Sequence, residues 1–229
     1  MKLLVLDTST EWCSAALWLD GQLHARRVLA EQQHSSLLLP MVDALLRESS
    51  ITLRQLDGLA YGAGPGSFTG LRIACAVTQG LALGADLPVA GVSTLESLAE
   101  QTGAERVLTV LDARMAEVYW AAYQREEAGW AAVVEPQLAL PESVAVPPGE
   151  GWVGAGNGFV ALGEALRPRL AVRLVRIDDT LMPDAAAMAP LAVRAFERGD
   201  GRDAALAAPI YLRDKVALTV DERRTRKSA

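Results

Sequence analysis

The residues of this sequence that could do chemistry are two aspartates and two glycine-rich turns. Glycine lets main-chain N–H groups approach an anion, and a helix that begins directly after such a turn adds a favourable dipole. The turns around Gly64 and Gly154 both precede a phenylalanine and a helical pattern. These turns alone support two interpretations equally well: the glycines have only a structural role, or they form a nucleotide site. The candidate phosphate-binding residues are Asp7, Thr8, Gly64, Gly66, Ser67, Gly154, Gly156 and Asn157.

Other chemistries find less support. The first turn lacks the lysine of a P-loop and misses the spacing of the dinucleotide-binding fingerprint. Ser67 does not stand in a Gly-x-Ser-x-Gly elbow, and a serine at the start of a helix usually caps that helix. The sequence has two histidines, His24 and His34, and no cysteine pair with ligand spacing. We therefore expect no metal site, with His24 on an exposed strand and His34 capping or packing.

The pattern of strand, aspartate and glycine turn occurs twice in the same order. In the first copy Asp7 follows an apolar run and Gly62 begins the later turn. In the second copy Asp112 and Gly154 occupy the equivalent positions. Such turns are common in α/β proteins, but two ordered coincidences favour an internal duplication, because repeats of a supersecondary unit leave this trace. The boundary between the halves is expected near residues 101–105.

The elements that must position these residues alternate between strands and helices. Asp20-Gly21 predicts a tight hairpin, since both positions tolerate positive φ. Ser35 or Ser36 is expected to cap a helix, with Pro40 near its first turn, where a missing N–H costs least. In the first half we expect strands at 2–6, 13–19, 22–28, 57–63 and 88–92, and helices at 35–48, at 68–83 and after Ser93 or Thr94.

The second half is less regular. Strands are expected at 109–112 and around 119–122, a helix at 183–198 with Asp184 near its start, and an extended segment at 209–213. The proline-rich residues 136–149 are expected to wrap the surface. Residues 221–229 carry four basic side chains and are expected to form a solvated, mobile tail.

Composition indicates a folded, cytoplasmic protein. Hydrophobic residues make up 51% of the 229 residues, which is enough for a sizeable core. Asp7 interrupts the apolar start, so no signal peptide is expected, and no later stretch is expected to be long enough to span a bilayer. Cys13 and Cys75 are expected to be reduced core residues. The net charge of −6 argues against direct nucleic-acid binding, so contact with RNA is expected only through a partner.

The expected helix at 68–83 carries a stripe of small residues. Glycine inside a helix costs about 1 kcal/mol relative to alanine, so a close approach should compensate. The stripe could pack on its own sheet or against another subunit. The second interpretation is favoured because the helix at 35–48 is also rich in leucine and methionine. The candidate interface consists of Leu38, Met41, Leu45, Gly70, Ala74, Val77, Gly80 and Leu81.

Taken together, these motifs resemble the TsaB (YeaZ) family, whose plan is that of the actin-like ATPases, in which glycine turns clamp phosphates and aspartates hold magnesium. The resemblance covers residues 2–215 and rests most on the block Pro-Gly-Ser-Phe-Thr-Gly at 65–70. It implies an α/β fold of two tandem actin-like ATPase (ribonuclease H-like) lobes, with mixed five-stranded sheets flanked by helices. The expected domains are residues 1–103 with the partner-binding helices, a smaller lobe at 104–216, and a flexible tail at 217–229.

The resemblance also implies a non-catalytic accessory subunit. Family members pair with TsaD, which with TsaE forms threonylcarbamoyl on the tRNA adenosine next to the anticodon, and they form homodimers when alone. TsaD carries a His-x-x-x-His metal motif where this sequence offers Thr94 and Leu98, so no catalytic metal is expected. No cofactor is required, and weak or interface-shared ATP or ADP binding stays open. The rival hypotheses are an actin-like small-molecule kinase or ATPase and a protease, the latter without an identifiable triad.

Overall fold

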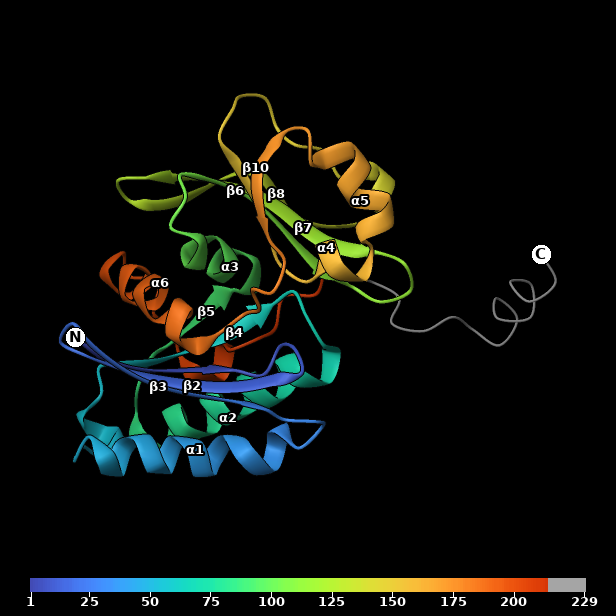
Figure 1. Cartoon of the computed structure of the whole chain (residues 1–229). Coiled ribbons are helices and arrows are strands. Elements are labelled where there is room, and N and C mark those ends of the chain that lie inside the picture. The colour runs from blue at the N-terminus through green and yellow to red at the C-terminus, as the bar shows by residue number, and fades with distance from the viewer. Residues whose placement is uncertain (214–229) are drawn as a thin grey trace.

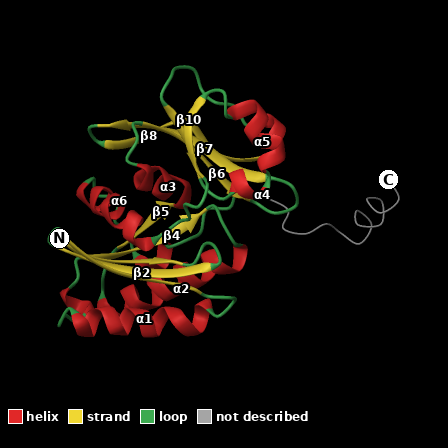
Figure 2. Cartoon of the chain, in the orientation of Figure 1, coloured by secondary structure: helices red, strands yellow, loops and turns green. Residues whose placement is uncertain are grey.

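The computed structural model describes residues 1–213, which fold into two lobes, each built on a mixed five-stranded sheet (Figures 1 and 2). The order is β3-β2-β1-β4-β5 in the first sheet and β10-β9-β6-β7-β8 in the second. The first sheet consists of β1 (Lys2–Asp7), β2 (Trp12–Leu19), β3 (Gln22–Leu29), β4 (Gly58–Gly64) and β5 (Val89–Ser93). The second consists of β6 (Arg106–Asp112), β7 (Val118–Glu126), β8 (Gly129–Ala139), β9 (Trp152–Ala155) and β10 (Leu174–Asp178).

The two sheets share one topology, which confirms the predicted duplication and the mixed α/β fold. In the first sheet β1 pairs antiparallel with β2 and parallel with β4. In the second, β6 pairs antiparallel with β7 and parallel with β9. Asp7 and Asp112 therefore end equivalent central strands.

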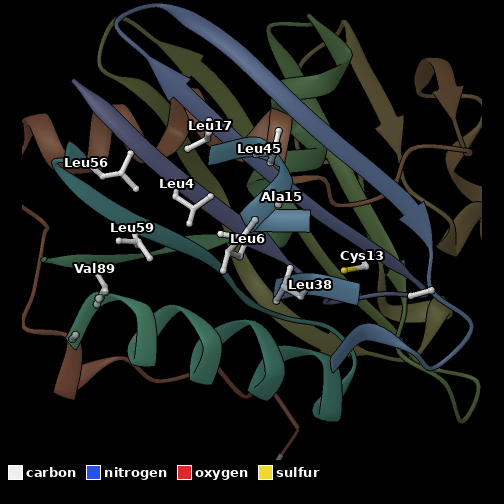
Figure 3. Packing of buried hydrophobic residues seen from close by; sticks show 14 residues of the cluster. Leu4, Leu6, Cys13, Ala15, Leu17, Leu38, Leu45, Leu56, Leu59 and Val89 are labelled. Carbon is white, nitrogen blue, oxygen red and sulfur yellow. The ribbon is translucent and has the colours of Figure 1, made fainter. Parts of the chain in front are cut away.

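Helices α1 (His34–Glu48) and α2 (Phe68–Ala85) cover one face of the first sheet (Figure 1). Alternating side chains of β1 and β2, among them Leu4, Leu6 and Leu17, point toward these helices and are fully buried (Figure 3). Burial of each leucine contributes roughly 2 kcal/mol. This core anchors the strand ends that carry the candidate site.

The other face of the first sheet is covered by α6 (Ala185–Glu197), although α6 follows the last strand of the second sheet. Conversely, Leu95 and Leu98 of α3 (Thr94–Thr102) pack against the second sheet, although α3 follows the last strand of the first. The predicted division into residues 1–103 and 104–216 is therefore wrong for both helices. An amphipathic helix requires an apolar partner face, but its sequence does not specify which sheet supplies it.

The other face of the second sheet is covered by α4 (Gly158–Ala161) and α5 (Gly163–Leu170). Its core is built around Trp152 and Phe159, at most 1% exposed. The remaining elements are three short 3₁₀ helices: η1 (Leu53–Gln55), η2 (Pro141–Ser143) and η3 (Ala204–Leu206).

Several local predictions are confirmed. Asp20 and Gly21 adopt positive φ in the β2–β3 hairpin. Ser67 caps α2, Ser93 caps α3 and Asp184 caps α6, each by accepting a main-chain hydrogen bond. Both cysteines are free and buried.

Other local predictions are wrong. Neither Ser35 nor Ser36 caps α1, which begins at His34 with Gln33 at the N-cap and no side-chain cap. Pro136 lies inside β8, where the edge of the sheet tolerates its missing N–H. The segment 209–213 lies outside the helices and strands, which does not contradict the prediction that it is extended. The predicted tail, at 217–229 or 221–229, lies outside the described residues.

Helix α2 meets the length and composition of a membrane span, with 18 residues and a mean hydropathy of 1.2. The expectation that no segment was long enough is therefore wrong. In this fold Leu71, Ala74 and Ala82 of α2 are buried beside the first sheet. Its hydropathy thus reflects one face packed in the core and an apolar outer face.

Candidate functional site

A cavity of about 570 Å³ lies between the lobes, at the carboxyl ends of the central strands. Ligands of α/β sheets commonly bind at this end of the strands. The first lobe lines the cavity with Ser9, Gly66 and Ser67, and the second lobe lines it with Asp112 and Asn157. The duplicated motifs thus meet at one place, as two equivalent sheets facing each other require.

Three of the predicted phosphate-binding residues, Gly66, Ser67 and Asn157, line this cavity. The other five candidates do not line it. Each of these five has a structural role in the wall behind the cavity. They are Asp7, Thr8, Gly64, Gly154 and Gly156.

In the first lobe the glycines allow two loops to touch. A Cβ on Gly70 would lie 1.9 Å from the carbonyl oxygen of Thr8, and one on Gly66 would lie 2.5 Å from that of Ser9. The main-chain N–H of Ser67 donates to the Ser9 carbonyl at 2.7 Å, and Thr8 Oγ1 donates to the Gly70 carbonyl at 2.7 Å. The Ser67 donor that could have held a phosphate is therefore satisfied within the chain.

Asp7 is fully buried beneath these loops. Burial raises the pKa of its carboxyl group to about 7, although hydrogen bonds from the hydroxyl and main-chain N–H of Ser9 partly oppose the shift. A Cβ on Gly62 would lie 2.0 Å from Asp7 Oδ1, so Gly62 makes room for the carboxyl group. Asp7 is thus enclosed and does not face the cavity.

The raised pKa predicts how Asp7 affects stability. Between the ordinary pKa of 3.8 and the folded value of about 7, the folded chain holds a proton that the unfolded chain releases, so stability falls as pH rises through this window. Replacing Asp7 with asparagine removes this loss. We expect D7N to gain about 2 kcal/mol relative to the wild type between pH 5 and pH 8, measured by urea unfolding.

The matched control for this experiment is D43N, which alters an exposed carboxyl group on α1. The difference between D43N and the wild type should change little over the same range. A constant difference between D7N and the wild type at the two pH values would show that Asp7 is not held protonated by burial.

In the second lobe Asn157 joins the two motifs. Its Oδ1 accepts a hydrogen bond from the main-chain N–H of Asp112 at 3.0 Å. Gly156 lies against the end of the same strand, since a Cβ there would be 2.3 Å from the Val110 carbonyl oxygen. A Cβ on Gly154 would lie 2.9 Å from the Phe159 ring. These glycines also serve close packing.

Both arginines of the cavity are paired with carboxylates of the same chain. Arg114 contacts Asp112 at 3.1 Å, and Arg213 contacts Glu117 at 2.6 Å. His34 Nε2 lies 2.9 Å from the Thr10 carbonyl oxygen, as expected for a packing role. Within residues 1–213, no group of three or more histidine, cysteine, aspartate or glutamate side chains could hold a metal ion. The cavity thus offers little unpaired positive charge to a phosphate.

Four cavity residues come from the end of the described chain, namely Ile210, Tyr211, Leu212 and Arg213. Tyr211 and Arg213 close the rim, and Arg213 also donates to the Ala113 carbonyl at 3.1 Å. The only signal for them in the sequence is the motif Pro-x-Tyr-Leu-Arg at 209–213, which carries no indication of position. Their contribution depends on a long-range chain path.

The predicted interface residues divide between two environments. Leu38, Leu45, Gly70 and Ala74 are buried inside this chain, so the prediction is wrong for these four. Met41, Val77 and Leu81 are half-buried, and Gly80 is exposed, with no atom within 4 Å of a Cβ built on it.

The outward faces of α1 and α2 contain other apolar and small residues. Leu39 is 48% exposed and Leu83 is 58% exposed, with Ala76 and Gly84 also at the surface. Apolar outer faces of this kind are typical of protein–protein contacts. We refer to Leu39, Met41, Ala76, Gly80, Leu83 and Gly84 as the helix face.

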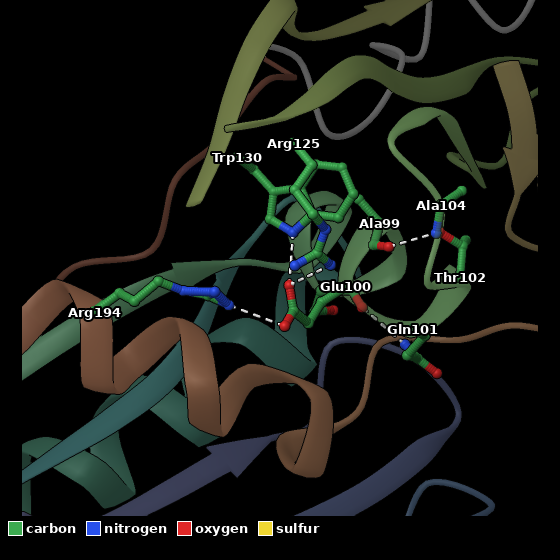
Figure 4. A network of polar contacts seen from close by, with 9 residues as sticks. Ala99, Glu100, Gln101, Thr102, Ala104, Arg125, Trp130 and Arg194 are labelled. Atoms are coloured by element: carbon green, nitrogen blue, oxygen red, sulfur yellow. Dashed lines mark hydrogen bonds and ion pairs between the residues drawn. The ribbon is translucent and has the colours of Figure 1, made fainter. Parts of the chain in front are cut away.

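A polar hub, none of whose residues lines the cavity, connects the lobes (Figure 4). Glu100 of α3 accepts from Arg125 at 3.2 Å and from Trp130 Nε1 at 2.7 Å, both in the second sheet, and from Arg194 of α6 at 2.9 Å. The Glu100 side chain is 15% exposed. One carboxylate therefore links both lobes.

Comparison with known proteins gives a consistent result. Residues 28–159 match the family model described as TsaD, tRNA N6-adenosine threonylcarbamoyltransferase. The chain is 44% identical, over 95% of its length and 96% of the relative, to the tRNA threonylcarbamoyladenosine biosynthesis protein TsaB of Escherichia coli. It is 36% identical to the protein of the same name from Haemophilus influenzae, over 94% of this chain and 95% of the relative.

Solved structures agree with this result. A Pseudomonas aeruginosa protein described as uncharacterized, with similarity to peptidase YEAZ, superposes with a TM-score of 0.86 and 42% identity, covering 93% of this chain and 99% of that one. The structure described as YeaZ from Pseudomonas aeruginosa gives a TM-score of 0.83 and 41% identity, covering 92% of this chain and 99% of that one.

Proposed function

The chain belongs to the TsaB family, and from that premise we propose that it is a non-catalytic accessory subunit in the formation of threonylcarbamoyladenosine on tRNA. In this role it pairs with TsaD and activates it, in an assembly that also contains TsaE. The observation that carries the proposal is the helix face. It is an exposed apolar surface on α1 and α2, whose opposite sides pack on the first sheet.

The geometry of the cavity supports an accessory role over a catalytic one. The strand-end carboxylate of the first lobe is enclosed, and Asp112 in the second lobe is paired with Arg114. A catalytic acid, base or metal ligand must reach the reacting atoms. Neither aspartate is free to do so, which favours a function through binding.

The charge of the chain supports indirect contact with tRNA. Its 28 acidic residues exceed its 22 basic ones, giving a net charge of −6. Affinity for nucleic acid derives largely from neutralised phosphates, so an acidic chain contributes little of it. We therefore assign tRNA binding to the partner and expect the whole assembly to act in the cytoplasm.

One observation favours a second candidate, an actin-like small-molecule kinase or ATPase. The interlobe cavity of about 570 Å³ falls within the range of small-molecule sites. Calorimetric titration with ATP and magnesium separates the two functions. A kinase should bind in the micromolar to millimolar range of enzyme substrates, whereas an accessory subunit needs no such binding.

Reconstitution of the modification reaction tests the leading proposal. TsaD, TsaE, tRNA and the threonylcarbamoyl donor are combined with and without this chain, and threonylcarbamoyladenosine is measured by mass spectrometry. We expect product formation to depend on the chain. Equal rates in its absence would remove the accessory role, and turnover by the isolated chain would show that it is itself an enzyme.

Substitution of Gly80 tests the helix face. Leucine fits at this position in the monomer, because no atom lies within 4 Å of the Cβ, but its side chain would hold an approaching helix away. We expect G80L to weaken both self-association and pairing with TsaD at least tenfold, measured by analytical ultracentrifugation and calorimetry.

The matched control adds the same side chain elsewhere. A161L places a leucine at an exposed position of α4, on the second lobe, and should leave both associations unchanged. If G80L and A161L behave alike, the helix face is not the interface.

A further inference from the structure

After α6 the chain passes to the face of the first sheet that α2 covers, and residues 204–211 run along α2 as a strap. At one end Gln79 Nε2 donates to the Ala204 carbonyl at 2.9 Å. In the middle the Ala208 main chain exchanges hydrogen bonds of 3.0 Å with the Tyr61 hydroxyl. At the other end Tyr211 meets the first turn of α2. The strap therefore follows α2 in the opposite direction.

Aromatic and cationic contacts fix the far end of the strap. The Arg72 guanidinium lies 3.7 Å from the centroid of the Phe68 ring, and its Nε donates to the Tyr211 hydroxyl at 2.8 Å. The rings of Phe68 and Tyr211 are 5.5 Å apart. The main-chain N–H of Ile210 donates to the Ala63 carbonyl at 2.7 Å. These contacts hold the strap in one position before any partner binds.

The outer side of the strap is apolar although it faces solvent. Leu206 is 69% exposed, and Ile210 and Tyr211, which also line the interlobe cavity, are 50% and 44% exposed. The neighbouring helix α2 carries one charged residue, Arg72, in 18 positions. Apolar and aromatic side chains on a preformed, charge-poor surface are typical of the centre of an interface. The strap thus continues the helix face on the flank of α2.

We propose that the strap is part of the surface that binds TsaD and widens it beyond the two helices. This inference rests on the proposed function. The match to the TsaD model spans residues 28–159 and so includes α1 and α2, which means that a protein of that model carries counterparts of both helices. Equivalent helices can pair across an approximate two-fold axis. The strap lies outside the matched residues. It would therefore add a contact from this chain to TsaD that the paired helices do not make.

The test replaces Leu206 with glutamate in the full-length chain. At 69% exposure the change should not disturb folding, which circular dichroism and thermal melting verify. Calorimetry with purified TsaD measures the affinity. We expect L206E to bind at least tenfold more weakly than the wild type, because a carboxylate would be buried against an apolar partner surface.

The matched control is V175E, which places the same charge at a residue of β10 that is 70% exposed, on the second lobe. V175E should bind TsaD as the wild type does. Equal affinities for L206E and the wild type, with G80L still weakened, would overturn the strap proposal and leave the proposed function standing. Failure of the wild-type chain to bind TsaD would instead overturn the proposed function.

Two further outcomes identify other occupants of the strap. If L206E weakens self-association but not binding to TsaD, the strap contacts a second copy, and the proposal is wrong. If a chain truncated after Arg213 binds TsaD more tightly than the full-length chain while L206E has no effect, residues 214–229 cover the strap, which also overturns the proposal.

Discussion

Replacing Gly70 with alanine is expected to destabilise the protein by about 4 kcal/mol, a large part of the stability of a typical domain. The added Cβ would lie 1.9 Å from the main-chain oxygen of Thr8. Unlike a clash with a flexible side chain, this one can be relieved only by moving backbone. Thr8 and Gly70 are both buried, and the Thr8 hydroxyl donates a hydrogen bond to the Gly70 carbonyl. Urea unfolding at neutral pH measures the loss.

The control for G70A lies ten positions along the same helix. Gly80 has open space around its Cβ, so G80A should be neutral or gain up to about 1 kcal/mol from helix propensity. If G70A unfolds at the same urea concentration as the wild type, the two segments that meet at Gly70 and Thr8 can move apart. The nearby Ser67 N–H is then not committed to the Ser9 carbonyl.

Replacing Glu100 with alanine is expected to cost about 3 kcal/mol. The change leaves Arg125, Arg194 and the Trp130 N–H without their shared acceptor in a site that is largely shielded from water. Removing one partner of a buried ion pair typically costs 3–5 kcal/mol, and the partial exposure of both arginines places the expectation at the lower end. Thermal unfolding measures the effect as a loss of roughly 6–12 °C.

The control for E100A removes a carboxylate from an exposed ion pair. Glu48 pairs with Arg26 and is 59% exposed, so E48A should change stability by less than about 1 kcal/mol. A loss in E100A no greater than that in E48A would mean that the hub does not hold the lobes together. Their relative position would then depend on the apolar contacts of α3 and α6.

The hub and residues 210–213 both connect the two lobes. Glu100 connects α3, α6 and the second sheet on one side. On the cavity side, residues 210–213 bond to Ala63 in the first lobe and to Ala113 and Glu117 in the second. Enzymes that close two lobes around a substrate need lobes that can move. A cavity pinned on both sides is better suited to a subunit that presents a constant surface.

The helix face shows what periodicity can and cannot predict. The spacing of small residues predicts one stripe on α2, whereas the structure divides these residues between a buried and an exposed face. The spacing does not reveal which residues face the sheet, because alanine and glycine suit a close internal contact and an exposed one equally well. Ala74 and Gly70 are internal, while Ala76 and Gly80 lie outside, and only the position of β4 and the loop at Thr8 separates them.

Local chemistry was sufficient for the duplicated plan. Strand runs, the Asp-Gly hairpin and the caps at Ser67 and Ser93 depend on residues within a few positions of one another, so their outcome is encoded in short stretches of sequence. The order of the motifs then implied two equivalent sheets.

What the sequence by itself determined is therefore most elements of the first lobe, the duplication and the family, while β8, β10 and α5 of the second lobe were not predicted. The tertiary structure alone decided that α3 and α6 pack on the opposite lobes, that Asp7 is enclosed beneath Gly62, and that residues 204–213 return across the cavity to α2. The physical reason is range: hydrogen bonds and caps form between near neighbours, whereas burial depends on which distant surfaces fit together, and many arrangements satisfy the same local pattern.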